Sequence, residues 1–188
     1  MYHVMLDLET LSLQPNAAII QIGAAMFDMG TGLVVRGFEM CLKASAKDAS
    51  QHFDQKTLAW HTEDEKRNAA YRETQRLGEE SQCEVLEAFS AWYKSHPVQA
   101  IWANGSNFDI PILEFAYNAE KLEVPWGYRD VRDLRTFQAI ADPFDKYVKP
   151  GPTAHTAYLD AHEQAERVMW LNMTMLRSFG LGFTAAQD

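Results

Sequence analysis

The sequence predicts an α/β fold: a mixed sheet, with antiparallel strands first and parallel strands later, and helices on both faces. Three β-leaning apolar segments open the chain, and a turn-rich stretch at 28–32 joins two of them as a hairpin. After these strands, amphipathic helical patterns alternate with one more short apolar run, Val98–Ala103. Strands followed by alternating helix and strand are typical of a mixed sheet covered on both sides.

The strands are expected at residues 4–8, 17–27, 34–42 and 98–103. Pro15 lies in a loop at 11–16, and a polar loop follows the third strand at 43–50. The run at 98–103 is short, apolar and bounded by turn signals, which is the pattern of a buried strand.

Helices are expected between and after these strands. A short helix covers 54–60, and the capping-box pattern from Thr62 to Glu65 starts another that Gly78 ends. Residues 81–95 carry an apolar stripe and stop before Pro97, and Pro111 suits the first turn of the next helix. Residues 131–141 form a further helix candidate, 142–155 a Pro-rich loop, and the last helix ends at Gly180.

Composition limits the function classes. The chain of 188 residues fits one domain, 1–188, with 47% hydrophobic residues to form a core. A net charge of −9 argues against a basic DNA-coating protein or a membrane-surface binder. No apolar run reaches the length of a membrane span, and the start lacks a signal-peptide pattern. Two widely spaced cysteines, Cys41 and Cys83, indicate a reducing cytoplasm.

Four carboxylates and one histidine stand out by their positions. Asp7 and Glu9 end the first strand, and side chains two apart on a strand project to one face. Asp109 follows the buried strand at 98–103, where α/β sheets build their sites. Asp160 lies early in the last helix, five residues after His155.

This residue set suits metal-dependent hydrolysis. Carboxylate oxygens without neighbouring cysteines favour Mg²⁺ or Mn²⁺ over zinc. Two such ions about 4 Å apart activate a water and stabilise a leaving oxygen in phosphodiester hydrolysis. A neutral histidine such as His155 then accepts the proton of the attacking water.

Each residue also has a structural explanation when taken alone. Acidic pairs such as Asp7 and Glu9 arise by chance in a chain with 26 acidic residues. Asp109 fits a helix cap or first-turn acid, His155 a satisfied surface or core histidine, and Asp160 a solvated helix residue. Their joint order and context favour the catalytic interpretation.

Three segments resemble the motifs of the DEDD 3′→5′ exonucleases, in the branch whose fifth residue is histidine. They are Asp7-Leu8-Glu9-Thr10, the segment from Asn104 to Leu113, and the segment from His155 to Ala161. In the second, one extra residue separates Asn104 from Phe108 relative to the family pattern. The superfamily includes polymerase proofreading subunits, oligoribonuclease and RNase T, and the resemblance implies an RNase H-like fold.

The resemblance also implies roles. Asp7 would bridge two divalent metal ions, Glu9 and Asp160 would complete the first site, Asp109 would hold the second ion, and His155 would be the general base. The residues expected beside the 3′-terminal nucleotide are Thr10, Leu11, Phe108 and Trp60. For Phe108 the alternative is a plain core position, and for Trp60 it is packing between helix and sheet.

Within the superfamily, residues 57–60 and 128–136 are similar to small bacterial and phage exonucleases, described as exodeoxyribonuclease VIII-like or as exoribonucleases. Arg129, Arg132 and Arg135 are candidates for phosphate contact, or simply a solvated helix face. The expected partner is a 3′ end of single-stranded DNA or RNA, and a homodimer is plausible. The competing hypotheses are a catalytically silent nuclease-like binding or scaffold protein, and a domain with structural Ca²⁺.

Overall fold

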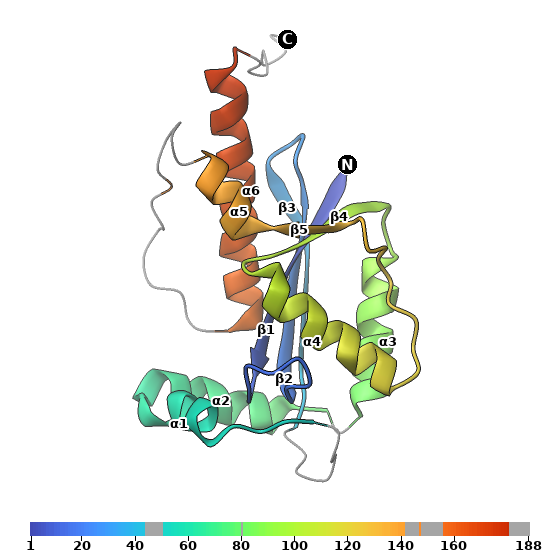
Figure 1. Ribbon diagram of the computed structural model, residues 1–188, viewed down its shortest axis with the longest axis vertical. Coiled ribbons are helices and arrows are strands. Elements are labelled where there is room, and N and C mark those ends of the chain that lie inside the picture. Colours follow the sequence, from blue (N-terminus) through green and yellow to red (C-terminus); the bar gives the residue numbers. More distant parts are fainter. Residues whose placement is uncertain (44–50, 80, 142–146, 148–155, 181–188) are drawn as a thin grey trace.

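A computed structural model describes residues 1–43, 51–79, 81–141, 147 and 156–180, and its strands form one mixed sheet (Figure 1). β1 pairs antiparallel with β2, which pairs antiparallel with β3, while β4 is parallel to β1 and β5 is parallel to β4. The predicted fold class is therefore confirmed. The strand order is β3-β2-β1-β4-β5, with bounds β1 Tyr2–Thr10, β2 Ile19–Asp28, β3 Leu33–Cys41, β4 Val98–Ala103 and β5 Val131–Asp133.

Helices cover both faces of the sheet. α5 and α6 pack on one face and α3 and α4 on the other, while α1 and α2 lie beyond the carboxyl end of β1 (Figure 1). Among the described residues, no helix combines the length and apolar character that crossing a bilayer requires. The helix bounds are α1 Gln55–Glu63, α2 Glu65–Leu77, α3 Gln82–Tyr93, α4 Ser106–Ala119, α5 Leu134–Ala141 and α6 Ala157–Ser178.

Successive side chains of β1 point to opposite faces of the sheet, and the two carboxylates share one face. Leu6 and Leu8 join the apolar cluster under α3 and α4, whereas Met5 joins the cluster under α5 and α6. Because successive side chains point to opposite faces, Asp7 and Glu9 share the Met5 face. β1 therefore directs both carboxylates to the side that α6 covers.

The start of α6 approaches the sheet closely at Gly23. Gly23 is opposite Asp7 in the β1–β2 pair. A Cβ atom on Gly23 would lie 2.1 Å from the carbonyl carbon of Ala157, so only glycine permits this contact. The Ala157 N–H also donates to Gln21 Oε1 at 2.9 Å. These contacts fix the first turn of α6 beside β1.

Two predicted helix starts are wrong. The helix predicted from Thr62 begins at Glu65, because the Asp64 side chain caps it by accepting from the N–H groups of Lys66 and Arg67. Thr62 belongs to α1, where its hydroxyl donates to Leu58. The second wrong start is the one predicted at Pro111. Pro111 lies inside α4 instead of in its first turn, because α4 already starts at Ser106. Buried α4 side chains offset the backbone hydrogen bond that Pro111 cannot donate.

The helix predicted over 131–141 is correct only from Leu134 onward. Val131–Asp133 form β5, which pairs in parallel with β4. This sheet pairing satisfies the backbone of three residues whose pattern alone resembled a helix start. Most of the loops predicted at 43–50 and 142–155 lie outside the described residues.

We expect Gly23→Ala to lower stability and to disturb the site, because its new methyl group overlaps the α6 backbone. Such overpacking costs about 1–3 kcal/mol. Thermal unfolding measures the loss, and Mn²⁺ titration measures the damage to the site. The control is Gly30→Ala in an exposed turn, where the added atom meets only the flexible Asp28 side chain at 3.3 Å. Equal melting temperatures for both variants would contradict this account.

Candidate active site

Three carboxylates converge where β1 ends and α6 begins. One oxygen from each of Asp7, Glu9 and Asp160 lies within 4.8 Å of the others, and all three side chains are partly buried. Asp7 and Glu9 come from one face of β1, and Asp160 comes from the first turn of α6. The structure thus brings together three of the five predicted catalytic residues.

The other two predicted catalytic residues are Asp109 and His155. Asp109, in the first turn of α4, is 5% exposed and accepts the Leu8 N–H at 3.1 Å. It borders the same hollow as Asp7 but is not one of the three converging carboxylates. His155 lies outside the described residues, so its distance to the carboxylates stays a prediction.

Burial and mutual repulsion disfavour the charged carboxylates. Burial raises the pKa of Glu9 to about 8, and the charges of Asp160 and Asp109 add to the rise. Burial also raises the pKa of Asp109 to about 7, against the opposing hydrogen bond from Leu8. The pKa of Asp7 is raised well above its usual value, first by burial and then by Asp109. Such a group must hold protons or a cation between its oxygens.

The donor set fits a hard divalent cation. Carboxylate oxygens are the ligands that Mg²⁺ and Mn²⁺ prefer, and cysteine is absent from the cluster. The Gln164 side chain orients Asp7 by donating from Nε2 to Oδ1 at 2.9 Å. Its Oε1 is buried and has no hydrogen-bond partner in the described part of the chain. Sequence reasoning missed Gln164, although it lies one helical turn after Asp160.

Two adjoining hollows border the carboxylates. The first, of about 470 Å³, lies beside Glu9. The second, of about 410 Å³, lies beside Asp7 and Asp109. Leu8, Leu13 and Phe108 line both hollows, so the two adjoin at these side chains.

The predicted nucleotide-binding residues are distributed unevenly. Thr10, Trp60 and Phe108 all line the first hollow. Phe108 also packs on the main apolar cluster, so its two suggested roles coexist. Leu11 is only 2% exposed, packs with Ile20 and lines neither hollow. The strongly exposed Leu13 has the position that was expected for Leu11.

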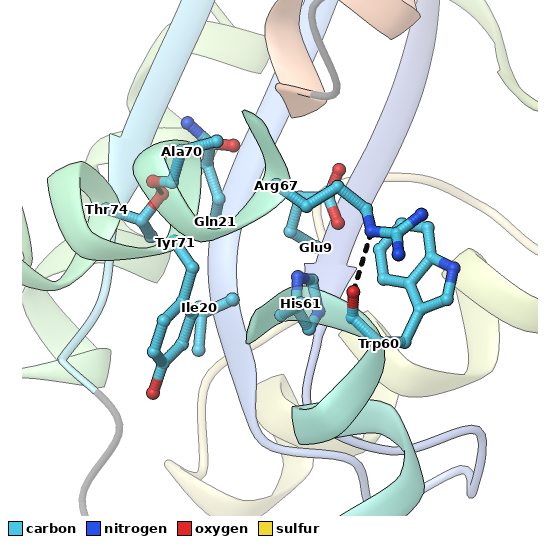
Figure 2. Close-up of a pocket in the computed structure, with 9 residues that line it drawn as sticks. All are labelled: Glu9, Ile20, Gln21, Trp60, His61, Arg67, Ala70, Tyr71 and Thr74. Carbon is cyan, nitrogen blue, oxygen red and sulfur yellow. Dashed lines mark hydrogen bonds between the residues drawn. The ribbon is translucent and has the colours of Figure 1, made fainter. Parts of the chain in front are cut away.

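Trp60 is held at the edge of the first hollow by Arg67. Figure 2 shows the Arg67 guanidinium over the indole ring, 4.5 Å from its centroid, and its Nε–H donates to the Trp60 carbonyl at 2.7 Å. The neighbouring His61 has its Nε2 at 2.9 Å from the Thr10 carbonyl, which only accepts, so Nε2 carries the proton. Burial lowers the pKa of His61, which favours the neutral ring. Trp60 is 44% exposed, so much of its ring remains open to solvent.

The fold is that of a DEDD-type 3′→5′ exonuclease domain. Residues 2–171 match the 3′-5′ exoribonuclease Rv2179c-like domain, and the chain belongs to this family. The predicted likeness to DEDD exonucleases with a histidine is confirmed at this level. The finer likeness to exodeoxyribonuclease VIII-like proteins stays a prediction.

Solved structures share the fold at low sequence identity. The nuclease domain of 3′hExo, a DEDDh family member bound to rAMP, has a TM-score of 0.61 at 11% identity, over 100% of this chain and 96% of that one. For cell-death related nuclease 4 (CRN-4) the TM-score is 0.63 at 14% identity, over 95% of this chain. For E. coli exonuclease I in complex with a dA16 oligonucleotide it is 0.72 at 13% identity, over 95% of this chain. The chain spans 64% of CRN-4 and 42% of exonuclease I. No curated protein sequence matched significantly.

The raised pKa values predict that, without metal, the folded protein becomes less stable as pH rises. The pKa values of Glu9 and Asp109, about 8 and about 7, exceed the ordinary values of 4.5 and 3.8 for these side chains. Between the ordinary and the raised pKa values, the folded state therefore binds more protons than the unfolded state. The free energy of unfolding falls as pH rises through this range. In EDTA we expect this effect to lower the melting temperature by at least about 3 °C between about pH 6 and pH 8.5.

Two comparisons isolate the carboxylates from other titrating groups. Glu9→Gln should flatten this pH dependence and melt at a higher temperature than the wild type at about pH 8.5 in EDTA. Mn²⁺ should stabilise the wild type more at the higher pH, where protons no longer compete. A wild type and a Glu9→Gln variant with parallel pH profiles would count against the repulsive cluster.

Proposed function

We propose that the chain is a metal-dependent 3′→5′ exonuclease that hydrolyses phosphodiester bonds at the 3′ ends of single-stranded or short nucleic acid and releases 5′-nucleoside monophosphates. The convergence of Asp7, Glu9 and Asp160 beside a hollow of about 470 Å³ carries this proposal. Membership of the 3′-5′ exoribonuclease Rv2179c-like family supports RNA as the first substrate to test.

The carboxylates have distinct proposed roles. Asp7 would contact both of two Mg²⁺ or Mn²⁺ ions, Glu9 and Asp160 would complete one site, and Asp109 would hold the other. When bound, these ions supply an activated water and stabilise the leaving oxygen. Gln164 would keep Asp7 in its orientation, because its amide already donates to that carboxylate.

His155 is the proposed general base. It lies two residues before α6 begins and five residues before Asp160, so the two residues are close in the sequence. A neutral imidazole would accept the proton of the attacking water, while the carboxylates remain ligands.

The first hollow is the proposed site of the 3′-terminal nucleoside. Thr10, Phe108 and Trp60 line it, and an aromatic ring such as Trp60 contributes about 1–3 kcal/mol when a base stacks on it. Leu11 would act only indirectly, because it is buried in a small apolar cluster with Ala18 and Ile20. The 3′hExo structure holds rAMP and exonuclease I structures hold oligonucleotides, which supports a single-stranded 3′ end as substrate.

The acidic balance of the chain predicts weak, distributive binding. A net charge of −9 gives little general attraction for phosphate, so the metal ions must offset the charge of the substrate locally. We propose one nuclease domain over 1–188, in a cytoplasmic setting that the free thiols Cys41 and Cys83 support, and as a homodimer.

A gel assay with 5′-labelled single-stranded RNA and matched DNA tests the proposed activity. With Mn²⁺ or Mg²⁺ we expect a ladder that shortens from the 3′ end, with EDTA abolishing it. The faster substrate decides between RNA and DNA, because the 2′-OH is read by local contacts. No cleavage of either strand would favour the silent binding or scaffold protein.

Asp160→Asn should abolish turnover and leave the melting temperature in EDTA equal or higher. The change removes a proposed metal ligand and one of the repelling charges, but little packing. The matched control is Glu166→Gln on the same helix, whose side chain is 51% exposed and is not one of the three converging carboxylates. Turnover of Asp160→Asn near the level of Glu166→Gln would exclude the proposed role of Asp160.

His155→Ala should lower kcat by about 10²–10⁴-fold, the usual contribution of a general base. Its affinity for Mn²⁺, measured by calorimetry, should stay unchanged because the four carboxylates remain. His162→Ala, on a partly exposed position of α6, is the control. An unchanged kcat at neutral pH would remove His155 from the mechanism.

A further inference from the structure

The second hollow has both acidic and basic lining residues. Asp7 and Asp109 line it, and so does Arg135, near the start of α5. The charge of Arg135 acts on Asp109, because it lowers the pKa of that carboxyl against the larger effect of burial. Among the described residues that line this hollow, Arg135 is the only cationic side chain. Asn104 and Asn107 complete its polar wall. An anionic ligand that enters this hollow therefore meets Arg135.

Arg135 is available for a ligand. It is exposed, and among the described residues no hydrogen bond or ion pair holds its guanidinium. It lies against the start of α4, where a Cβ atom on Gly105 would be 3.3 Å from Nη1. The guanidinium thus lies close to the start of α4, and its donors remain available for the hollow.

The neighbouring arginines differ from Arg135. Arg132 donates from Nη1 to the carbonyls of Arg129 and Val131, at 2.6 and 2.9 Å. Arg129 lies over the Tyr128 ring, 5.4 Å from its centroid, and donates to the Tyr128 hydroxyl. Neither arginine lines either of the two hollows. The structure therefore separates three arginines that the sequence presented as one group.

A bound strand would run from one hollow into the other. With the 3′-terminal nucleoside in the first hollow, the scissile phosphate lies at Asp7, Glu9 and Asp160. The strand then continues past the shared wall of Leu8, Leu13 and Phe108 into the second hollow. Its next phosphate would then lie in the hollow that Arg135 lines.

We propose that Arg135 binds the backbone phosphate on the 5′ side of the penultimate nucleotide and so makes the site selective for polynucleotide strands. This inference rests on the proposed function. A planar guanidinium matches the geometry of a phosphate group and forms paired charge-assisted hydrogen bonds with it. Arg135 thus distinguishes a strand from a nucleotide ester that carries only the scissile phosphate.

Kinetics with two substrates test this role. The first is a single-stranded oligonucleotide, and the second is the p-nitrophenyl ester of thymidine 5′-monophosphate, which has no penultimate nucleotide. We expect Arg135→Gln to raise KM for the oligonucleotide by about 10-fold and to leave kcat/KM for the ester unchanged. Arg132→Gln, whose side chain is engaged elsewhere, should change neither value. Equal effects of Arg135→Gln on both substrates, or no effect on either, would overturn the proposal.

Binding provides a readout that does not need turnover. In an Asp160→Asn background, the affinity for a fluorescent single strand is measured with and without Arg135→Gln over a range of salt concentrations. Because Arg135→Gln removes one phosphate contact, it should reduce the slope of log K against log salt by about 0.7. An unchanged slope would refute the contact. If the wild type cleaves neither substrate, the proposed function fails, while this measurement still decides whether Arg135 binds phosphate.

Discussion

The packing of the first turn of α6 on the sheet is the contact on which the site depends. Gly23 lets the α6 backbone approach β2 more closely than any side chain would permit, and Gln21 accepts the first N–H of the helix. Because Gly23 is opposite Asp7, this contact brings Asp160 against the carboxylates of β1. The apolar clusters on the two sheet faces hold β1 and α6 in place against the repulsion between these charges.

That repulsion also explains how an acidic protein can handle an acidic substrate. The carboxylates are costly in the free protein, and a divalent cation relieves this cost when it binds between them. In the proposed function the cation would present positive charge to the scissile phosphate, and Arg135 would offer positive charge to the next phosphate along the strand. A net charge of −9 is therefore compatible with nucleic-acid chemistry that involves few phosphates.

Sequence reasoning found the parts of the site that follow from local periodicity and motif order. Alternation along a strand placed Asp7 and Glu9 on one face, and motif order singled out Asp109 and Asp160. It could not find Gln164 or Gly23, since their roles come from contacts between segments far apart in the chain. The same limit explains β5, whose three residues become a strand only through pairing with β4. The start of α2 was misplaced because Asp64 and Thr62 are both good capping residues, and the backbone uses Asp64.

The wall of the first hollow has a separate origin from its floor. The floor consists of β1 and the start of α4, whereas Trp60 and its neighbours come from α1, which the Arg67 contact links to α2 (Figure 2). The two helices lie outside the layers that position the carboxylates (Figure 1). His61 is the exception, because its Nε2 contacts the Thr10 carbonyl beside Glu9. Substitutions at exposed positions of this helical pair can therefore change the wall of the hollow without moving the acidic cluster. In the proposed nuclease, substrate preference would then be able to change through α1 and α2 while the carboxylates keep their positions.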